Sequence, residues 1–458
     1  MKKIGKFKVY GLLGKGGMGK VFKIEYPVTQ KVCALKLLDP EPVLTSLLGL
    51  EAIEEIFTAE AVTMARIRHP HVAEILDFDR FQGKPYYIMD FYCNNLGTTL
   101  GESYETEKPS RILSVDKAIH YTRQILEGLS CLHYWSIIHR DIKPFNILLT
   151  DQDTVKICDF GLSKLRGETF KGHQSLKIGS PYYASPEQET DPENVDCSAD
   201  LFSTGVMLYR MLTGRLPITR KERPSSLNPD LDDDWDGFIL KAMADQPGDR
   251  YGEADDMISD LDQLTRLWQE KKEKICMAPL SLLQNLPAKP PQGKLRSEPA
   301  KIPKRSAENQ FLLDELMRPS IYTANDFKLL SRETVLDRAT GLIWQWSGTK
   351  FPVNWKGAGD YIRTLNQVQP EGISPWRLPT IPELMTLICQ TPSGQDHCIE
   401  AAFDPAQKWL WSADRCTWIT AWYVSLDMGF VAANDFSGFY HVKAVCSAPE
   451  PWHGEKSC

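Results

Sequence analysis

The chain has 458 residues, of which 42% are hydrophobic and 25% charged, and its formal net charge at pH 7 is -7. This length exceeds what one hydrophobic core usually holds, so we expect two folded domains, and the composition excludes a disordered or fibrous chain. The acidic balance excludes a general nucleic-acid binder. The sequence contains no run of about 18 apolar residues, so no membrane span is predicted.

The first residues and the cysteines predict the compartment. Residues 1–10, MKKIGKFKVY, are positively charged but no apolar stretch follows them, so no export signal is predicted. The eleven cysteines are irregularly spaced without a CxxC pair, which favours buried thiols over a disulfide framework or a zinc site. We therefore expect a cytoplasmic protein.

The first 90 residues predict short alternating strands around one amphipathic helix. Near the start, Gly14, Gly16 and Gly19 have G-x-G-x-x-G spacing, with Val21 behind them. Glycines let the backbone approach phosphate groups closely, although an ordinary turn or a dinucleotide-binding loop has the same spacing. These three interpretations remain open at this point.

A lysine and a glutamate follow at positions that suit an ion pair. Lys36 ends the apolar stretch of residues 33–35, either as a surface lysine or as a phosphate ligand. Glu60 lies among apolar residues of the predicted helix, where a carboxylate is costly without a cation. We therefore expect Glu60 to pair with Lys36. The apolar face of this helix comprises Ile53, Ile56, Phe57, Met64 and Ile67.

Residues 115 to about 270 are richer in helical patterns and contain two short motifs. Residues 139–146 read HRDIKPFN, and residues 159–161 read DFG. Together with the glycines and Lys36, these motifs resemble the protein kinase family over about 270 residues, in particular the bacterial eukaryotic-like (Hanks-type) serine/threonine kinases. The resemblance implies a two-lobed kinase fold.

The resemblance assigns each polar residue a role in phosphoryl transfer, which requires positioning and charge neutralisation. Asp141 would orient the acceptor hydroxyl, and Lys143 would steady the transferred phosphate. Asn146 and Asp159 would hold Mg²⁺, a hard cation that prefers oxygen ligands. Lys36, held by its glutamate partner, would bind the α and β phosphates of ATP.

The resemblance also implies where the adenine lies. Val21 and Ala34 would enclose it, although both residues also suit a plain core. The hinge is expected at residues 89–92, where the apolar strand YYIMDF runs out into a polar loop. Asp90 and Tyr92 mark this hinge, whose backbone groups would contact the base.

Later positions match the same family. Residues 185–187, SPE, are a variant of its A-P-E segment, and Asp200 precedes the stretch FSTG. Glu187 and Arg250 are expected to form a buried ion pair with a structural role.

Residues 162–183 are the predicted activation segment. Arg140, next to the predicted catalytic aspartate, is a cation that a phosphorylated side chain would pair with. Thr169 and Ser175 are the candidate acceptors, whereas Ser180 stands in a turn that suits substrate positioning. We therefore predict autophosphorylation at Thr169 or Ser175.

Residues 271–318 form a predicted linker. Between residues 279 and 305, six prolines alternate with six lysines and arginines. Prolines and charge repulsion keep such a segment extended. It is interpreted as a solvated spacer or, alternatively, as a docking site for an anionic partner.

A tryptophan-rich region follows the linker: nine of the twelve tryptophans lie between Trp344 and Trp452. Residues 337–344, DRATGLIW, and 376–380, WRLPT, resemble the DUF1566 family, which is also found as the C-terminal domain of Legionella collagen-like proteins. The resemblance covers about residues 330–448. It implies an irregular α+β fold like that of C-type lectins and formylglycine-generating enzymes, with binding as the usual role.

Within this region a helix is predicted at residues 381–389, with Leu384, Leu387 and Ile388 inward. Most tryptophans suit a core, and the cysteines Cys416 and Cys446 do not reproduce the copper-binding pair that formylglycine formation needs. Ligand contacts are therefore expected from exposed residues of the late segment. The candidates are Asp414, Arg415, Trp418, Asn434, Asp435 and Tyr440.

The predicted architecture is a kinase domain at residues 1–270, with lobes divided near residue 92, a linker at 271–318 and a lectin-like α+β domain at 319–458. The predicted function is a serine/threonine protein kinase that uses ATP and Mg²⁺, with a recognition domain attached. A nucleotide-binding pseudokinase scaffold is the alternative, and an exported surface binder is a third interpretation. The expected catalytic residues are Asp141, Lys143, Lys36 and Glu60; the nucleotide contacts are Gly14, Gly16, Gly19, Val21, Ala34, Lys36, Asp90, Tyr92, Asn146 and Asp159; and the metal ligands are Asn146 and Asp159.

Overall fold

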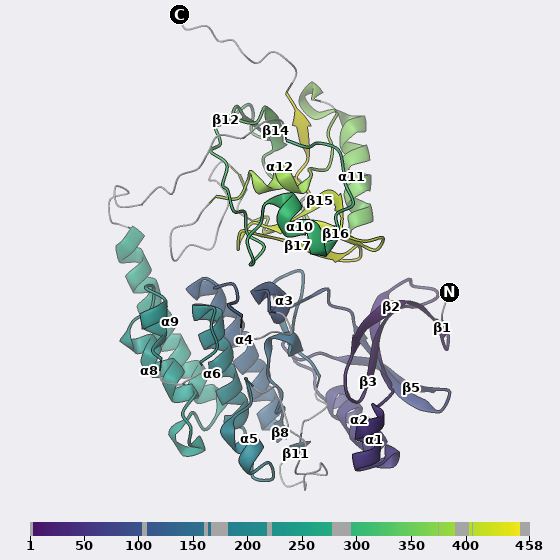
Figure 1. Cartoon of the computed structure of the whole chain (residues 1–458), viewed down its shortest axis with the longest axis vertical. Coiled ribbons are helices and arrows are strands. Elements are labelled where there is room, and N and C mark those ends of the chain that lie inside the picture. The colour runs from purple at the N-terminus through teal and green to yellow at the C-terminus, as the bar shows by residue number, and fades with distance from the viewer. Residues whose placement is uncertain are drawn as a thin grey trace, which may run out of the picture. The chain divides into compact units, whose positions relative to one another are not determined.

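The structure is a computed structural model that describes residues 3–102, 108–159, 164–165, 182–217, 222–276, 295–373, 375–389, 403–404 and 406–448. The chain divides into two compact units, Met1–Ala278 and Pro279–Cys458 (Figure 1). The predicted acceptors Thr169 and Ser175 lie outside the described residues, as do Ser180 and most of the predicted activation segment. No helix in the described part is long and apolar enough to cross a membrane.

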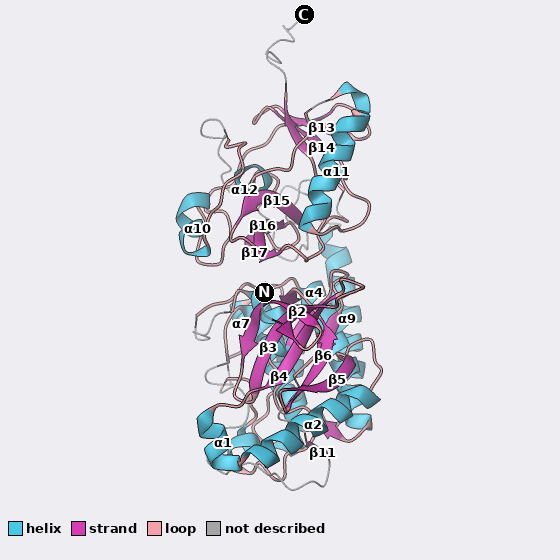
Figure 2. Cartoon of the chain, turned by 90° about the vertical axis from the view of Figure 1, so that its right-hand side faces the viewer, coloured by secondary structure: helices cyan, strands magenta, loops and turns pink. Residues whose placement is uncertain are grey.

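A six-stranded antiparallel sheet opens the first unit, in the order β1-β2-β3-β4-β6-β5 (Figure 2). Successive side chains of a strand point to opposite faces. On β4, Cys33 and Leu35 belong to one apolar cluster, whereas Leu38 belongs to the cluster that helix α2 covers. The strands are β1 (Lys3–Ile4), β2 (Phe7–Lys15), β3 (Gly19–Glu25), β4 (Val32–Leu38), β5 (Ile75–Phe81) and β6 (Lys84–Asp90).

Two helices follow β4: α1 (Pro42–Leu48) and α2 (Leu50–Arg66). The helix expected from the apolar spacing is α2, and Ile67 lies immediately beyond its end. Its buried residues recur every three or four positions and form one face. They are Ile53, Phe57, Glu60, Ala61 and Met64.

The rest of the first unit is mainly helical, and α4, α6, α8 and α9 pack against one another (Figure 1). The helix α6 is buried along its whole length and ends at Gly214, with φ at 69°. A Cβ there would lie 2.7 Å from the carbonyl oxygen of Ser110, so this turn requires glycine. The elements are β7 (Asn94–Asn95), α3 (Leu96–Leu100), α4 (Val115–Tyr134), β8 (Ile137–Ile138), η1 (Pro144–Asn146), β9 (Ile147–Leu149), β10 (Val155–Ile157), β11 (Lys164–Leu165), α5 (Pro186–Thr190), α6 (Ser198–Thr213), α7 (Pro224–Leu227), α8 (Asp233–Ala242), η2 (Pro247–Asp249) and α9 (Ala254–Cys276).

The second unit has two antiparallel sheets in its described part, in the orders β12-β13-β14-β18 and β15-β16-β17. The predicted helix at residues 381–389 is shorter than expected, because α12 ends at Met385, although Leu384, Leu387 and Ile388 are all buried. The elements are α10 (Lys304–Phe311), β12 (Phe327–Leu329), β13 (Thr334–Asp337), β14 (Leu342–Gln345), α11 (Trp355–Val368), η4 (Pro370–Gly372), α12 (Ile381–Met385), β15 (Trp409–Arg415), β16 (Thr420–Ser425), β17 (Phe430–Asp435) and β18 (Val445–Ser447).

The predicted linker is too long at both ends. Helix α9 continues to Cys276, and residues 295–318 pack into the second unit. Ile302 and Phe311 belong to the core of that unit, and the backbone N–H of Ile302 donates to the carbonyl of Arg415 (2.8 Å). Proline and charge content therefore predicted an extended segment, but they did not predict that Ile302 and Phe311 pack into the core of the second unit.

Candidate active site

Lys36 on β4 lies between two carboxylates. Its Nζ donates to Glu60 Oε1 at 2.9 Å and to Asp159 Oδ1 at 2.7 Å. Glu60 is 3% exposed and also accepts a 2.8 Å bond from the hydroxyl of Tyr87 on β6. The expected pair of Lys36 and Glu60 is confirmed, and Asp159 from the DFG motif joins it across 123 positions of sequence.

Burial by itself would lower the pKa of Lys36, but the neighbouring charges of Asp159 and Glu60 prevail and raise this pKa well above its usual value. The same ammonium lowers the pKa of Asp159. Burial, with Glu60 next to it, raises the pKa of Tyr87 well above its usual value. Lys36 and Asp159 are therefore charged at neutral pH and hold one another in place.

A second cluster of polar side chains surrounds Asp141. The Oδ2 atom of Asp141 accepts from Lys143 Nζ at 2.6 Å and from Asn146 Nδ2 at 3.0 Å. Among the described residues, its Oδ1 atom has no hydrogen-bond partner. One oxygen of this carboxylate is thus fixed by the protein, and the other is a buried acceptor that has no partner in the described part of the chain.

The backbone before Asp141 is held by Asp200, at the start of α6. Its two carboxylate oxygens accept from the backbone N–H groups of His139 (2.9 Å) and Arg140 (2.8 Å), and Arg140 has a positive φ of 68°. Burial opposes the charge of Asp200, yet its hydrogen bond with His133 leaves the pKa lowered. A charged, buried Asp200 therefore maintains this uncommon backbone conformation.

His139 connects the cluster around Asp141 with the one around Lys36. Its Nδ1 accepts from the backbone N–H of Asp141 (3.2 Å), so its Nε2 carries the proton and donates to the carbonyl of Cys158 (3.1 Å). The backbone N–H of Cys158 in turn donates to the carbonyl of Asn146 (3.0 Å). These bonds connect the segments that carry Asp141, Asn146 and Asp159.

The predicted phosphate loop is the hairpin between β2 and β3. Gly16 and Gly19 exchange backbone hydrogen bonds of 2.9 and 3.3 Å, which makes Gly17 and Met18 the two turn residues. A Cβ at Gly19 would lie 2.3 Å from the carbonyl oxygen of Leu37. Gly19 is thus required by close packing, whereas a Cβ at Gly14 or Gly16 meets open space.

The tip of this hairpin is attached to the chain between β4 and α1. The carbonyls of Gly17 and Met18 accept from the backbone N–H groups of Glu41 (2.9 Å) and Asp39 (3.1 Å). The Met18 side chain packs against the apolar cluster of α2 that includes Phe57 and Tyr87. The sequence pattern did not predict this attachment, since no motif marks residues 39–41.

The residues expected around adenine lie on neighbouring strands. Val21 on β3 is the register partner of Lys36, and Ala34 on β4 is the partner of Met89. Asp90 ends β6 and pairs with Lys31 at 2.6 Å. Tyr92 follows, and burial raises its pKa to about 12.

The donor set fits a magnesium ion. Asp159 provides a carboxylate, and the amide nitrogen of Asn146 is engaged by Asp141, which leaves the amide oxygen of Asn146 without a hydrogen bond among the described residues. Carboxylate and amide oxygens are the ligand types that Mg²⁺ prefers. Asn146 and Asp159 are therefore suitable ligands.

Glu187 and Arg250 form the expected structural ion pair. Arg250 donates from Nη1 and Nη2 to the two carboxylate oxygens of Glu187, at 2.7 and 2.8 Å. Burial opposes the charge of Glu187, but the bond with Arg250 leaves its pKa lowered. This bidentate geometry fixes α5 against the turn at η2.

In the second unit, three of the six candidate ligand contacts are buried, so their predicted exposure is wrong. Asp414 is 0% exposed, and both of its oxygens accept from Arg296 at 2.8 Å. Asn434 and Tyr440 are buried and bonded to each other. Trp418 is 74% exposed, as expected, and Lys301 lies over its ring at 3.9 Å. Arg415 is also exposed, and Asp435 is half-buried.

Two family models match the chain, one in each unit. The model described as "Protein kinase domain" matches residues 7–273, and the model described as "Lcl C-terminal domain" matches residues 333–446. The first match spans all the polar groups described around Lys36 and Asp141.

Curated relatives match the first unit. The probable serine/threonine-protein kinase PknB of Lactococcus lactis is 29% identical over 285 residues, which cover 59% of this chain and 44% of that protein. Serine/threonine-protein kinase pkn3 of Myxococcus xanthus is 31% identical over 278 residues, which cover 55% and 48%. Among solved structures, the Mycobacterium tuberculosis PknI kinase domain matches with a TM-score of 0.44 and 24% identity, covering 57% of this chain and 96% of that one. The chain spans less than half the length of these curated relatives.

Proposed function

The chain belongs to the protein kinase family, and on this basis we propose that it transfers the γ-phosphate of ATP to serine or threonine hydroxyls of proteins. The observation that carries the proposal is the pair of polar groups in the first unit. One is the buried cation of Lys36 between Glu60 and Asp159, and the other is Asp141, which has one bonded oxygen and one buried oxygen without a partner among the described residues.

In the proposed reaction, this second oxygen of Asp141 accepts a hydrogen bond from the acceptor hydroxyl and directs its lone pair at the phosphate. Lys143, whose Nζ lies 2.6 Å from Asp141, is placed to balance negative charge on the transferred group. Lys36 binds nucleotide phosphate oxygens while Glu60 restrains it. Asn146 and Asp159 would hold Mg²⁺, which would neutralise part of the phosphate charge.

The nucleotide contacts proposed for the other site residues follow their positions in the sheet. The hairpin with Gly14, Gly16 and Gly19 covers the phosphates, and Val21 and Ala34 enclose the base. The backbone at Asp90 and Tyr92 reads its edge. Their places on β3, β4 and the end of β6 support this assignment.

Control of activity is proposed to pass through autophosphorylation at Thr169 or Ser175. The support is the sequence position of both residues between the DFG and SPE motifs. A phosphate group there would supply an anion for basic residues such as Arg140.

The second unit is proposed to be a recognition domain with the irregular fold of C-type lectins, as its DUF1566-like motifs imply. The match to the Lcl C-terminal domain supports this family and leaves its ligand open. We propose a cytoplasmic location, where ATP is abundant and thiols stay reduced; eight cysteines of the described part of the chain are free thiols, which supports this location.

The test is transfer of labelled γ-phosphate from ATP with magnesium to a generic serine/threonine substrate and to the chain itself. Wild type should label both, and Asp141→Asn should lose at least 100-fold in rate while it still binds ATP. Absence of labelling in wild-type protein that binds ATP would favour the pseudokinase scaffold. Peptide mapping of labelled wild type then tests Thr169 and Ser175.

A further inference from the structure

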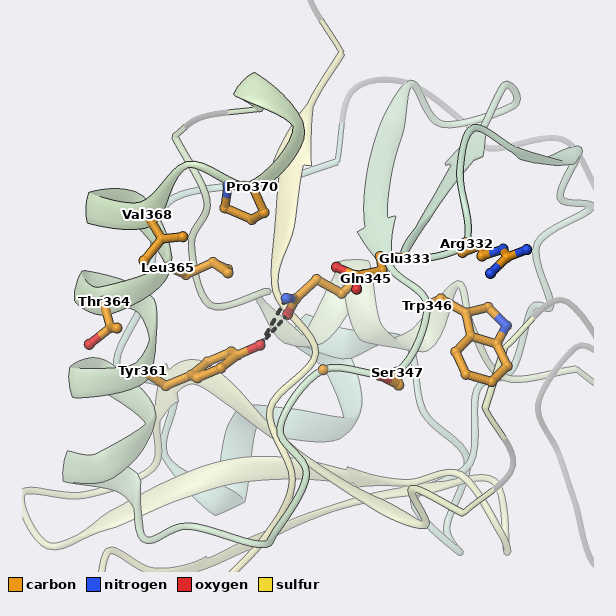
Figure 3. A pocket seen from close by; sticks show the side chains of 11 residues that line it. Arg332, Glu333, Gln345, Trp346, Ser347, Tyr361, Thr364, Leu365, Val368 and Pro370 are labelled. Atoms are coloured by element: carbon orange, nitrogen blue, oxygen red, sulfur yellow. Dashed lines mark hydrogen bonds between the residues drawn. The ribbon is translucent and has the colours of Figure 1, made fainter.

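The second unit contains a cavity of about 520 Å³ between α11, the end of β14 and the turn before β13 (Figure 3). Tyr361 and Leu365 reach it from α11, Gln345 from the end of β14, and Glu333 from the turn. The candidate ligand residues that we expected in the late segment of the sequence do not line it. This cavity is therefore a separate candidate for ligand binding.

Its floor is a fixed hydrogen-bonded pair. The backbone N–H of Ala444 donates to Gln345 Oε1 (2.9 Å), which orients the Gln345 amide so that its Nε2 donates to the hydroxyl oxygen of Tyr361 (2.8 Å). In Figure 3 these two side chains point toward each other across the floor. The floor is thus preorganised, and little rotamer entropy remains to be lost when a ligand binds.

Two charged side chains line the cavity, the carboxylate of Glu333 and the guanidinium of Arg332. Glu333 makes no ion pair with a described cation, and in Figure 3 it lies next to Gln345, whereas Arg332 and Trp346 point away from the Gln345–Tyr361 pair. Burial raises the pKa of Tyr361, and the charge of Glu333 adds to that rise against the bond with Gln345. The carboxylate field therefore reaches the floor.

The opposite wall is apolar. Leu365 and Val368 lie one helical turn apart on α11, and Pro370 continues their surface. Val368 is 71% exposed although it is a large apolar residue. Such a wall suits methylene groups, whereas the floor and Glu333 suit a polar head group.

From this arrangement we infer that the cavity binds a protonated amine or guanidinium group on an aliphatic stem, the chemistry of a lysine or arginine side chain. The head group pairs with the Glu333 carboxylate and reaches the hydroxyl oxygen of Tyr361, and the stem lies along Leu365 and Val368. This inference deepens the proposed recognition role of the second unit by stating the class of ligand.

The test is a binding titration of the full chain, without nucleotide, by saturation-transfer NMR. The probes are Nα-acetyl-lysine amide, Nα-acetyl-arginine amide and the neutral, similarly shaped Nα-acetyl-norleucine amide. The cationic probes should bind at least tenfold more tightly than the norleucine probe, because a charge-assisted bond is worth about a factor of ten or more. A further titration with free lysine distinguishes two sources of the ligand. Free lysine should bind as tightly as Nα-acetyl-lysine amide if the natural ligand is a small molecule, and more weakly if it is a side chain of a peptide.

Glu333→Gln should weaken the cationic probes about tenfold without changing the melting temperature, since the side chain is exposed. Tyr361→Phe should weaken them by a smaller factor. Glu308→Gln, which removes an exposed carboxylate of α10 outside the cavity, should leave binding unchanged. Asp141→Asn should also bind normally, which separates this outcome from a failure of the kinase proposal. Equal binding of the norleucine probe, or unchanged binding in Glu333→Gln, would overturn the inference.

Discussion

Two buried lysines show how the surroundings of an ammonium group decide its pKa. Lys36 has two carboxylates within 3 Å, and its pKa is raised despite burial. Lys443 in the second unit is 0% exposed, and burial lowers its pKa to about 7 against the weaker influence of Asp404. Its Nζ donates to the carbonyls of Trp346 (2.5 Å) and Ser347 (3.1 Å). Lys36 therefore keeps its proton to a higher pH than an ordinary lysine, whereas Lys443 loses its proton at a lower pH.

A pH dependence of stability follows for Lys443. In the unfolded chain its pKa is near the usual value of about 10.4, so the unfolded state binds an extra proton between pH 7 and about 10. Stability should rise with pH across this window, by roughly 2–3 kcal/mol from pH 7 to 9. The measurement is urea unfolding of wild type and Lys443→Met, followed by tryptophan fluorescence.

The difference between the two proteins isolates the lysine, because other titrating groups are common to both. Lys356→Met, an exposed lysine on α11, is the control and should follow the wild-type slope. A pH-independent difference between wild type and Lys443→Met would mean that the carbonyls keep the ammonium charged.

At this scale the sequence predicted pairings between residues of recognisable motifs, including Glu187 with Arg250 across 63 positions, but not the pairing that involves the predicted linker. Glu60 was expected to need a cation because it interrupts an apolar helix face, and Lys36 was the natural candidate. Asp414 was expected at the surface, because its partner Arg296 lies 118 positions away in a segment that reads as linker. A polar residue is buried only where a partner satisfies it, and that partner is not visible from its neighbours.

Among the elements, the β2–β3 hairpin shows how a loop becomes attached to a helix. Its tip carbonyls bond to residues 39–41, Lys20 pairs with Asp39, and Met18 enters the apolar cluster of α2. The same cluster contains Tyr87, which bonds to Glu60. We therefore expect a shift of α2 to move the hairpin as well as Glu60.

We expect Met18→Ala to raise the KM for ATP roughly fivefold with a smaller change in kcat, because the lost apolar contact is worth about 1 kcal/mol and acts on the loop that covers phosphate. Steady-state kinetics with varied ATP measures this. Met18→Leu should restore the wild-type KM. The matched control is Leu12→Ala, an exposed residue of β2 in the same hairpin, and a KM change equal to that of Met18→Ala would refute a specific role for the tip.

Element types were predictable where apolar spacing is regular, and element lengths less so. The spacing of Ile53, Phe57 and Met64 located α2, a helix of 17 residues with a regular buried face. The helix at 381–389 was predicted from the same kind of spacing, but it ends at Met385, and Leu387 and Ile388 are buried from a turn. Buried residues at helical spacing therefore do not require a continuous helix.

At the scale of the whole molecule, the two units have separate cores, and the second begins earlier than expected. Asp414 accepts from Arg296 and from the backbone N–H groups of Ala300 and Ile381, each at 2.8 Å. Trp422 donates to the carbonyl of Ile302 (2.8 Å). Residues 295–313 are thus an integral part of the second unit.

A fragment of residues 291–458 should therefore fold, whereas a fragment of residues 319–458 should not, because Asp414 would remain buried without its cation and the core would lose Phe311. Near-ultraviolet circular dichroism and urea unfolding of both fragments measure this. In the full chain, Arg296→Met should destabilise the second unit by about 3–5 kcal/mol. Arg305→Met on α10, an exposed position, is the control, and an equally stable 319–458 fragment would contradict the prediction.

The pair of Arg296 and Asp414 also bears on how such a domain is exchanged between genes. The segment that matches the Lcl C-terminal domain begins at residue 333, after residues 295–313, which include Arg296. A recombination that transferred only the matching segment would deliver a charge without its counter-ion to a new host protein. The unit that is inherited intact must then be larger than the unit that similarity detects, with its upstream breakpoint before residue 295.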